Sequence, residues 1–212
     1  MTEAEARAWV QGEFDVSRET IERLDAFAGL LATENERQNL VSRGTLSHIW
    51  ERHFVDSAQL LRFISSPEAS WLDLGTGAGF PGLVIAALHG GPVTLIESRR
   101  LRVNFLQRAA EVLGVTDRVT ILLDRVERVP TRTFNVISAR AFAPMRELLE
   151  LAHRFSTEKT RWILPKGRSA QSELEAAESS WQGSFRLEPS LTDPDSGIII
   201  ADAVRPRGRK RA

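Results

Sequence analysis

The chain has 212 residues, of which 42% are hydrophobic, and its 28 Lys and Arg side chains balance its 28 Asp and Glu side chains. This length fits one α/β domain that can bury about 70% of its unfolded surface. The chain has no cysteine, which excludes a cysteine nucleophile, a thiolate metal site and a dithiol redox motif. No apolar run approaches the roughly 20 residues of a membrane span. We therefore expect a soluble protein, and we also expect it to be a cytoplasmic monomer that binds neither a membrane nor a metal ion.

The N-terminal part of the chain is predicted to be helical. Apolar residues recur at helical spacing in residues 1 to about 40, so one face of a helix there would be buried. A second helix is predicted from Thr45 to Phe63, with Thr45 as its candidate cap. Within it, Arg52 and His53 lie four and three residues before Asp56, so that each can meet the aspartate on the helix surface. Because no nucleophile lies nearby, we interpret these pairs as ion pairs rather than as a catalytic pair.

Beyond residue 65, short apolar strands alternate with helices. The predicted strands are Trp71 to Leu74, Val93 to Glu97, Val119 to Asp124, Phe134 to Ala139 and Trp162 to Leu164, and the predicted helices are 82–89, 99–113 and 145–155. A polar helix from Ser169 to Ser180 and a buried strand from Ile198 to Val204 follow, the strand completing the sheet as an antiparallel pair. This alternation predicts an α/β, Rossmann-like fold with a mostly parallel central sheet, whose ligands bind at the carboxyl ends of the strands.

We expect a single domain, residues 1–212. It would consist of an N-terminal helical cap at 1–64, a Rossmann-like core at 65–206 and a basic tail at 207–212. The tail region contains Arg205, Arg207, Arg209, Lys210 and Arg211. These cations either neutralise phosphates of a nucleic acid or form a solvated end of the chain.

A glycine-dense turn follows the first predicted strand and reads Asp73-Leu74-Gly75-Thr76-Gly77-Ala78-Gly79-Phe80-Pro81-Gly82. From Gly77 onward it fits the dinucleotide pattern G-x-G-x-x-G, but the strand already reaches Gly75, two residues earlier. Asp73 also lies inside the strand end. Apolar residues, an acid and alternating glycines in this order resemble the first motif of adenosylmethionine-dependent methyltransferases. Gly75 and Gly77 would then border the methionine part of the cofactor.

The ends of the next two strands carry acids. Glu97 ends the second strand about 20 residues beyond the first glycines, where an acid usually binds the ribose hydroxyls of a nucleotide. The alternative is an acid that stabilises a helix start. Asp124 ends the third strand and is followed by Val126 and Glu127, which should flank the adenine. Either Asp124 or Glu127 would supply the hydrogen-bond acceptor for the ring, unless this segment is only a charged loop.

The segment after the fourth strand limits the methyl acceptor. It reads Ser138-Ala139-Arg140-Ala141-Phe142-Ala143-Pro144 and lacks the Pro-Pro-aromatic string of adenine amino methylation. Attack through pyrimidine carbon-5 requires a cysteine, and the chain has none. An acceptor that is already nucleophilic remains, and guanine N7 qualifies because its lone pair needs no deprotonation. Positioning then supplies most of the catalysis, and no catalytic acid or base is assigned.

Two cations lie at the ends of the fourth and fifth strands. Arg140 can hold the carboxylate of the methionine part of the cofactor or a nucleic-acid phosphate, with a structural ion pair as the alternative. Lys166 lies beside Gly167 at the rim of the same predicted cleft. We expect Lys166 to bind the substrate through a phosphate.

Several motifs in the same order resemble one known family. They are Asn39-Leu40-Val41-Ser42, Arg52-His53-Phe54-Val55-Asp56-Ser57, the glycine turn from Asp73 to Gly82, Ile96-Glu97-Ser98, Arg125-Val126-Glu127, Ser138-Ala139-Arg140-Ala141 and Pro165-Lys166-Gly167. Together they are similar to the glucose-inhibited division protein B family of bacterial 16S ribosomal RNA guanine-N7 methyltransferases. The resemblance implies S-adenosyl-L-methionine as the cofactor and 16S ribosomal RNA or the small ribosomal subunit as the partner. It also places cofactor contacts on Gly75, Phe80, Val126, Glu127 and Arg140.

Overall fold

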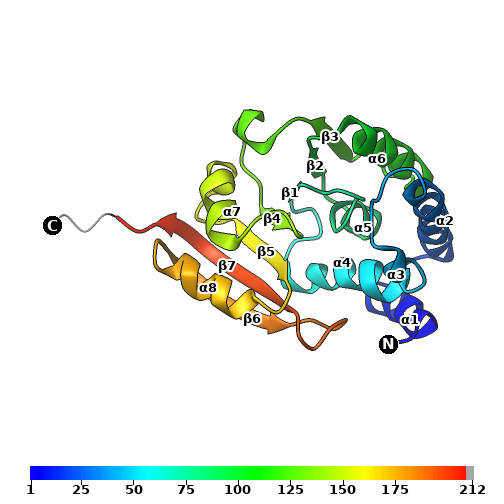
Figure 1. Cartoon of the computed structure of the whole chain (residues 1–212), viewed down its shortest axis with the longest axis horizontal. Helices are drawn as coiled ribbons and strands as arrows, with labels where there is room; N and C mark the ends of the chain where they lie inside the picture. The colour runs from blue at the N-terminus through cyan, green and yellow to red at the C-terminus, as the bar shows by residue number, and fades with distance from the viewer. Residues whose placement is uncertain (209–212) are drawn as a thin grey trace.

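The structure is a computed structural model that describes residues 1–208, and it contains one seven-stranded sheet with helices on both faces (Figure 1). The strands are β1 (Trp71–Leu74), β2 (Val93–Glu97), β3 (Val119–Leu123), β4 (Val136–Ala139), β5 (Arg161–Lys166), β6 (Trp181–Pro189) and β7 (Gly197–Pro206). Their order is β3-β2-β1-β4-β5-β7-β6. Strands β1 to β5 pair in parallel, whereas β7 is antiparallel to both β5 and β6. The predicted mostly parallel sheet is confirmed.

Strand β6 is the one strand that the sequence did not predict. It forms an edge of the sheet and pairs only with β7, so most of its side chains are exposed or half-buried and Trp181 alone is buried. An edge strand of this kind needs no continuous apolar run. The turn between β6 and β7 nevertheless contributes to the site described below.

The helices that follow the core strands are α5 (Gly82–Leu88), α6 (Arg100–Leu113), α7 (Met145–Ala152) and α8 (Ala170–Glu178), together with two short 3-10 turns, η3 (Val126–Arg128) and η4 (His153–Phe155). The four α-helices match the predicted helices, with ends shifted by a few residues, whereas η3 was not predicted. Alternate strand residues point to opposite faces and bury two apolar cores. Trp71, Val93 and Leu95 pack with α5, α6 and the cap, whereas Leu72, Leu74 and Ile96 pack with α7 and α8.

The N-terminal region contains more, shorter helices than predicted. They are α1 (Glu3–Glu13), α2 (Arg18–Asn35), α3 (Arg43–Leu46), the π-helix η1 (Trp50–Val55), α4 (Asp56–Ala58) and the 3-10 helix η2 (Gln59–Phe63). The first predicted helix breaks because Asp15 adopts a left-handed conformation with φ 46°, and the Ser17 side chain then caps α2. None of the helices among residues 1–208 combines the length and apolar character of a membrane span.

The second predicted helix is also divided, and its expected cap was wrong. Thr45 lies inside α3, and Ser42 holds the N-cap position. The Thr45 hydroxyl instead donates a hydrogen bond to the Ser42 carbonyl at 2.9 Å. The hydroxyl lies 2.9 Å from the Nε2 atom of His53 on η1, so Thr45 links two cap helices rather than starting one.

An aromatic cluster joins the cap to the glycine turn. The Phe27 ring lies 5.8 Å from Phe54 in the cap, 5.6 Å from Phe80 in the glycine turn and 6.2 Å from Phe105 on α6, measured between ring centroids. All four rings are buried. The cap therefore shares its apolar core with the segment that follows β1.

Candidate cofactor and substrate site

The carboxyl end of β1 is fixed by a buried chain of hydrogen bonds. Trp71 Nε1 donates to Ser138 Oγ at 2.8 Å, and Ser138 Oγ donates to Asp73 Oδ1 at 2.8 Å. The backbone N–H of Gly82 donates to the other Asp73 oxygen at 3.1 Å. Burial raises the pKa of Asp73 to about 6, and the hydrogen bonds from Ser138 and Gly82 oppose that rise. Asp73 thus joins β1, β4 and the start of α5 around the glycine turn.

The glycine turn lies against the segment that follows β4. Gly75 and Gly77 have φ of +63° and +59°, a left-handed conformation that favours glycine. A Cβ atom on Gly75 would lie only 2.3 Å from Cδ2 of Phe142. The Phe142 ring therefore rests directly on the backbone of the turn, which requires glycine at position 75.

Two cavities open along this edge of the sheet. The β2–β3 cavity has a volume of about 440 Å³ and is bounded by the ends of β1, β2 and β3. The β4–β5 cavity has a volume of about 490 Å³ and is bounded by the cap, the ends of β4 and β5, and the β6–β7 turn. Both are lined by Ala141, Phe142 and Ala143. This short segment therefore forms the wall that the two cavities share.

Glu97 lies in the β2–β3 cavity and orders the turn beside it. Its Oε2 atom accepts from the Gly77 N–H at 3.2 Å, and its Oε1 atom accepts from the Arg99 N–H at 2.9 Å. Arg102 Nη1 lies 3.5 Å from Glu97 Oε2 and forms an ion pair with it. The Glu97 side chain is buried. Arg99 is the N-cap residue of α6. Glu97 therefore also has the alternative role that the sequence allowed, that of an acid at the start of a helix. A carboxylate has about four acceptor positions, which leaves room for ribose hydroxyls.

The other residues predicted to bind the nucleoside lie in the same cavity. Gly75, Val126, Glu127 and Asp124 all contribute to its lining. Val126 is buried and offers an apolar surface, and Arg154 donates to the Val126 carbonyl and holds η3 in place. Asp124 and Glu127 both reach the cavity, so both remain candidates for the acceptor that reads the adenine.

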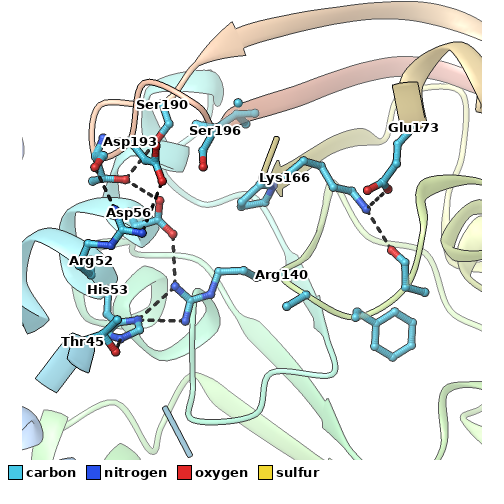
Figure 2. Close-up of a pocket in the computed structure, with 18 of the residues that line it drawn as sticks. Thr45, Arg52, His53, Asp56, Arg140, Lys166, Glu173, Ser190, Asp193 and Ser196 are labelled. Carbon is cyan, nitrogen blue, oxygen red and sulfur yellow. Dashed lines mark hydrogen bonds and ion pairs between the residues drawn. The ribbon is translucent and has the colours of Figure 1, made fainter. Parts of the chain in front are cut away.

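Arg140 faces the other cavity. Its Nη1 atom donates to Asp56 Oδ2 at 3.2 Å, and Nη1 and Nη2 each lie 3.3 Å from Nδ1 of His53 (Figure 2). The expected pairing of Arg52 and His53 with Asp56 is not formed. Arg52 instead donates to the Thr192 carbonyl at 3.3 Å in the β6–β7 turn. Both acceptor groups of the cap thus converge on Arg140.

Lys166 lines the β4–β5 cavity but also makes an internal ion pair. Its Nζ atom donates to Glu173 Oε2 on α8 at 2.7 Å and to the Ala143 carbonyl at 3.0 Å (Figure 2). Burial would raise the pKa of Glu173, but the hydrogen bonds from Lys166, Ser169 and the Met145 N–H outweigh burial and lower it. Lys166 therefore anchors the wall segment to α8, and its third N–H group is left for a ligand.

The structure divides the predicted site residues into three groups. Gly75, Glu97, Val126 and Glu127 line the β2–β3 cavity, and Arg140 and Lys166 line the β4–β5 cavity. Phe80 lines neither, because its ring is buried beneath His53 and Arg140. Gly77 contributes its N–H to Glu97. Sequence reasoning gave Phe142 no role, since an aromatic residue in a loop carries no periodic signal.

The β2–β3 cavity fits the nucleoside part of adenosylmethionine. It combines a buried carboxylate at Glu97, an apolar surface at Val126 and the backbone of Gly75. Its volume lies in the usual range of small-molecule sites, roughly 300–1,000 Å³. No cluster of His, Asp and Glu in the described part of the chain is arranged to hold a metal ion.

Solved structures define the class of the fold. A SAM-dependent methyltransferase from Aquifex aeolicus aligns with a TM-score of 0.60 and 17% identity, covering 80% of this chain and 97% of that one. A mutant of MtNAS in complex with S-adenosylmethionine aligns with a TM-score of 0.57 and 15% identity over 92% of this chain and 82% of that one. The protein has the Rossmann-like fold of adenosylmethionine-dependent methyltransferases.

Sequence comparisons then give the family. The family model described as rRNA small subunit methyltransferase G matches residues 20–191. The chain is 52% identical to the ribosomal RNA small subunit methyltransferase G of Rhizorhabdus wittichii, over 99% of this chain and 96% of that protein. It is 53% identical to the protein of the same name from Novosphingobium aromaticivorans, over 94% and 88%. The chain belongs to the rRNA small subunit methyltransferase G family, which confirms the resemblance seen in its motifs.

Proposed function

We propose that this protein transfers a methyl group from S-adenosyl-L-methionine to N7 of a guanine in 16S ribosomal RNA. Its family membership supports this function. The observation that carries the proposal is the pair of cavities that share one wall at residues 141–143. One cavity suits a nucleoside. The other is lined by Arg52, Arg140 and Lys166, each paired with a carboxylate of the same cavity, and their remaining N–H groups suit the phosphates of a polyanionic substrate. A ribosomal substrate implies a cytoplasmic protein.

In this proposal the chain binds the cofactor mainly through the β2–β3 cavity. Glu97 accepts hydrogen bonds from the ribose hydroxyls, Val126 packs against the adenine, and Glu127 or Asp124 reads its edge. Gly77 lets the methionine part approach the backbone closely, since the nearest atom to a Cβ there would be 3.8 Å away, and Gly75 borders that part through its backbone beside Phe142. When bound, the cofactor supplies an electrophilic methyl group on a sulfonium sulfur.

The residues of the β4–β5 cavity receive the base. A protein reaches a base best when it lies in a loop or is drawn out of its stack. The N7 lone pair would form the new N–C bond as the C–S bond breaks and its electrons return to sulfur. No proton leaves the base, so no residue has to act as a general base. Lys166 and Arg140 bind and orient anionic groups, and Arg140 takes either the methionine carboxylate or an RNA phosphate.

The test is transfer of labelled methyl from adenosylmethionine to small ribosomal subunits purified from cells that lack this protein. Label at a single guanine N7, mapped on the 16S RNA, is the expected result. Parallel reactions with protein-free 16S RNA identify which form is the substrate. Cofactor binding without transfer to either form would reject the proposed activity and favour a non-catalytic role in ribosome assembly.

A further inference from the structure

Two cap residues, Asp56 and His53, contact the guanidinium of Arg140, although they lie 84 and 87 positions away from it in the sequence. Asp56 Oδ2 accepts from Nη1, and His53 Nδ1 accepts from the facing hydrogens of Nη1 and Nη2. Both residues lie at the π-helical turn η1 or directly after it. Turns of this kind occur frequently at functional sites.

The contacts of His53 define a single tautomer. Since a guanidinium can only donate, Nδ1 must carry the lone pair and Nε2 must carry the proton. Nε2 then donates to the Thr45 hydroxyl, which donates onward to the Ser42 carbonyl. Burial, followed by the charges of Arg140 and Arg52, lowers the pKa of His53 to about 3, which agrees with a neutral ring.

The guanidinium is held on further sides as well. Its Cζ atom lies 5.1 Å from the centroid of the Phe80 ring, and the His53 ring stacks on the same phenyl ring at 4.8 Å. Asp56 is fixed in turn, because its Oδ1 atom accepts from Thr192 Oγ1 at 2.9 Å and from Gln59 Nε2 at 3.2 Å. The acceptors that hold Arg140 are therefore themselves immobilised.

One edge of the guanidinium is left for a ligand. Nε and the outer hydrogen of Nη2 have no hydrogen-bond partner within residues 1–208. These two donors form the side of an arginine that binds a carboxylate or phosphate through two parallel hydrogen bonds. A structural ion pair alone would need only Asp56, whereas the additional acceptor at His53 fixes the direction of the free edge.

We propose that His53 and Asp56 are positioning residues that orient the free edge of Arg140 toward its anionic ligand. The inference rests on the proposed function in so far as that ligand is the methionine carboxylate of the cofactor or an RNA phosphate. It assigns a role to the cap motif from Arg52 to Ser57, which the proposed function does not use.

The test compares His53→Asn with His53→Phe. Asparagine places its Oδ1 atom near the position of Nδ1 and keeps an acceptor for Arg140, whereas phenylalanine keeps the stacking on Phe80 but has no acceptor. We expect His53→Phe to weaken binding of S-adenosylhomocysteine or raise the KM for RNA about tenfold, the loss of one hydrogen bond to a charged group. His53→Asn should stay within about threefold of the wild type. Calorimetry measures the first quantity and methyl-transfer kinetics the second, with thermal unfolding as a check on the fold.

Three further variants make the result specific. In an Arg140→Ala background, His53→Phe should have no additional effect on ligand binding, because the residue acts through Arg140. Asp56→Asn should weaken binding of the same ligand while leaving the contact between His53 and Arg140 in place. His153→Phe is the matched control, since His153 also packs against an aromatic ring, Trp181 at 5.2 Å, away from Arg140.

The outcomes separate this inference from the proposed function. If His53→Asn is more impaired than His53→Phe, the ring acts only in packing and the inference is overturned. It is also overturned if Arg140→Ala is impaired while both His53 variants and Asp56→Asn behave as wild type, or if Arg140→Ala itself has no effect. If the wild type binds S-adenosylhomocysteine but methylates no RNA, the proposed function fails, and a selective loss of binding in His53→Phe still supports the positioning role.

Discussion

Gly75→Ala should be strongly destabilising because two separate costs coincide at this position. A left-handed conformation costs an L-residue about 1–2 kcal/mol relative to glycine. The new Cβ would also lie 2.3 Å from the Phe142 ring, which must leave its half-buried place against the second core. Displacing that ring adds about 1 kcal/mol, a partial loss of its burial. We expect the free energy of unfolding to fall by about 2–3 kcal/mol.

Gly29→Ala is the matched control, since Gly29 lies inside α2 and a Cβ there meets open space. This change should stabilise the protein by about 0.5–1 kcal/mol. Urea unfolding measures both variants, and calorimetry with S-adenosylhomocysteine should show that Gly75→Ala alone loses affinity. Adding Phe142→Ala to Gly75→Ala should remove the steric cost and leave the conformational one. If Gly75→Ala were as stable as Gly29→Ala, or showed no coupling to position 142, the contact between the turn and the wall segment would be wrong.

Three further results are expected. Ser138→Ala leaves Trp71 Nε1 and Asp73 Oδ1 without their partner, and should lower the unfolding free energy by about 2–4 kcal/mol in urea titrations. Because the folded-state pKa of Asp73 is raised from 3.8 to about 6, its contribution to stability is complete below about pH 4 and is lost as pH rises through 6. Asp73→Asn should make the unfolding free energy less dependent on pH in that window, and an unchanged profile would contradict the assignment. Residues 209–212 lie outside the described residues and contain three cations. Removing them should make the slope of log K for RNA binding against log salt concentration shallower by about two. An identical slope would identify a solvated tail.

The sequence predicted the sheet and the β2–β3 cavity because both follow from local patterns. Apolar runs of strand length identify β1 to β5, and the carboxyl ends of parallel strands meet at one edge. Gly75, Glu97 and Val126 each end or follow a strand, and the structure brings all three to one cavity. These residues are far apart in the sequence, but the parallel strands that precede them lie side by side and bring them together.

The β4–β5 cavity could not be predicted in the same way. One wall comes from the cap, where the sequence suggests that Arg52 and Asp56 pair along a helix. The π-helical turn ends at Val55 and the chain continues into very short helices, so Arg52 contacts the β6–β7 turn instead. That turn follows an edge strand that has no continuous apolar run. This cavity is formed by contacts between residues that lie 84 to 141 positions apart in the sequence. A local periodic pattern does not predict contacts of this kind.

Phe80 joins the glycine turn to the cap and to Arg140. Its backbone belongs to the glycine turn, and its N–H donates to the Thr76 carbonyl at 3.1 Å. One neighbour of its ring is Phe27 in the cap core, and on the cavity side His53 and Arg140 lie against it. A shift of the turn on cofactor binding would therefore move the surface on which Arg140 rests. Because His53 and Asp56 hold the guanidinium from the cap, the order of the glycine turn and the direction of Arg140 are physically linked. The cofactor contact that the resemblance assigned to Phe80 stays a prediction, and its buried ring has the further role of supporting His53 and Arg140.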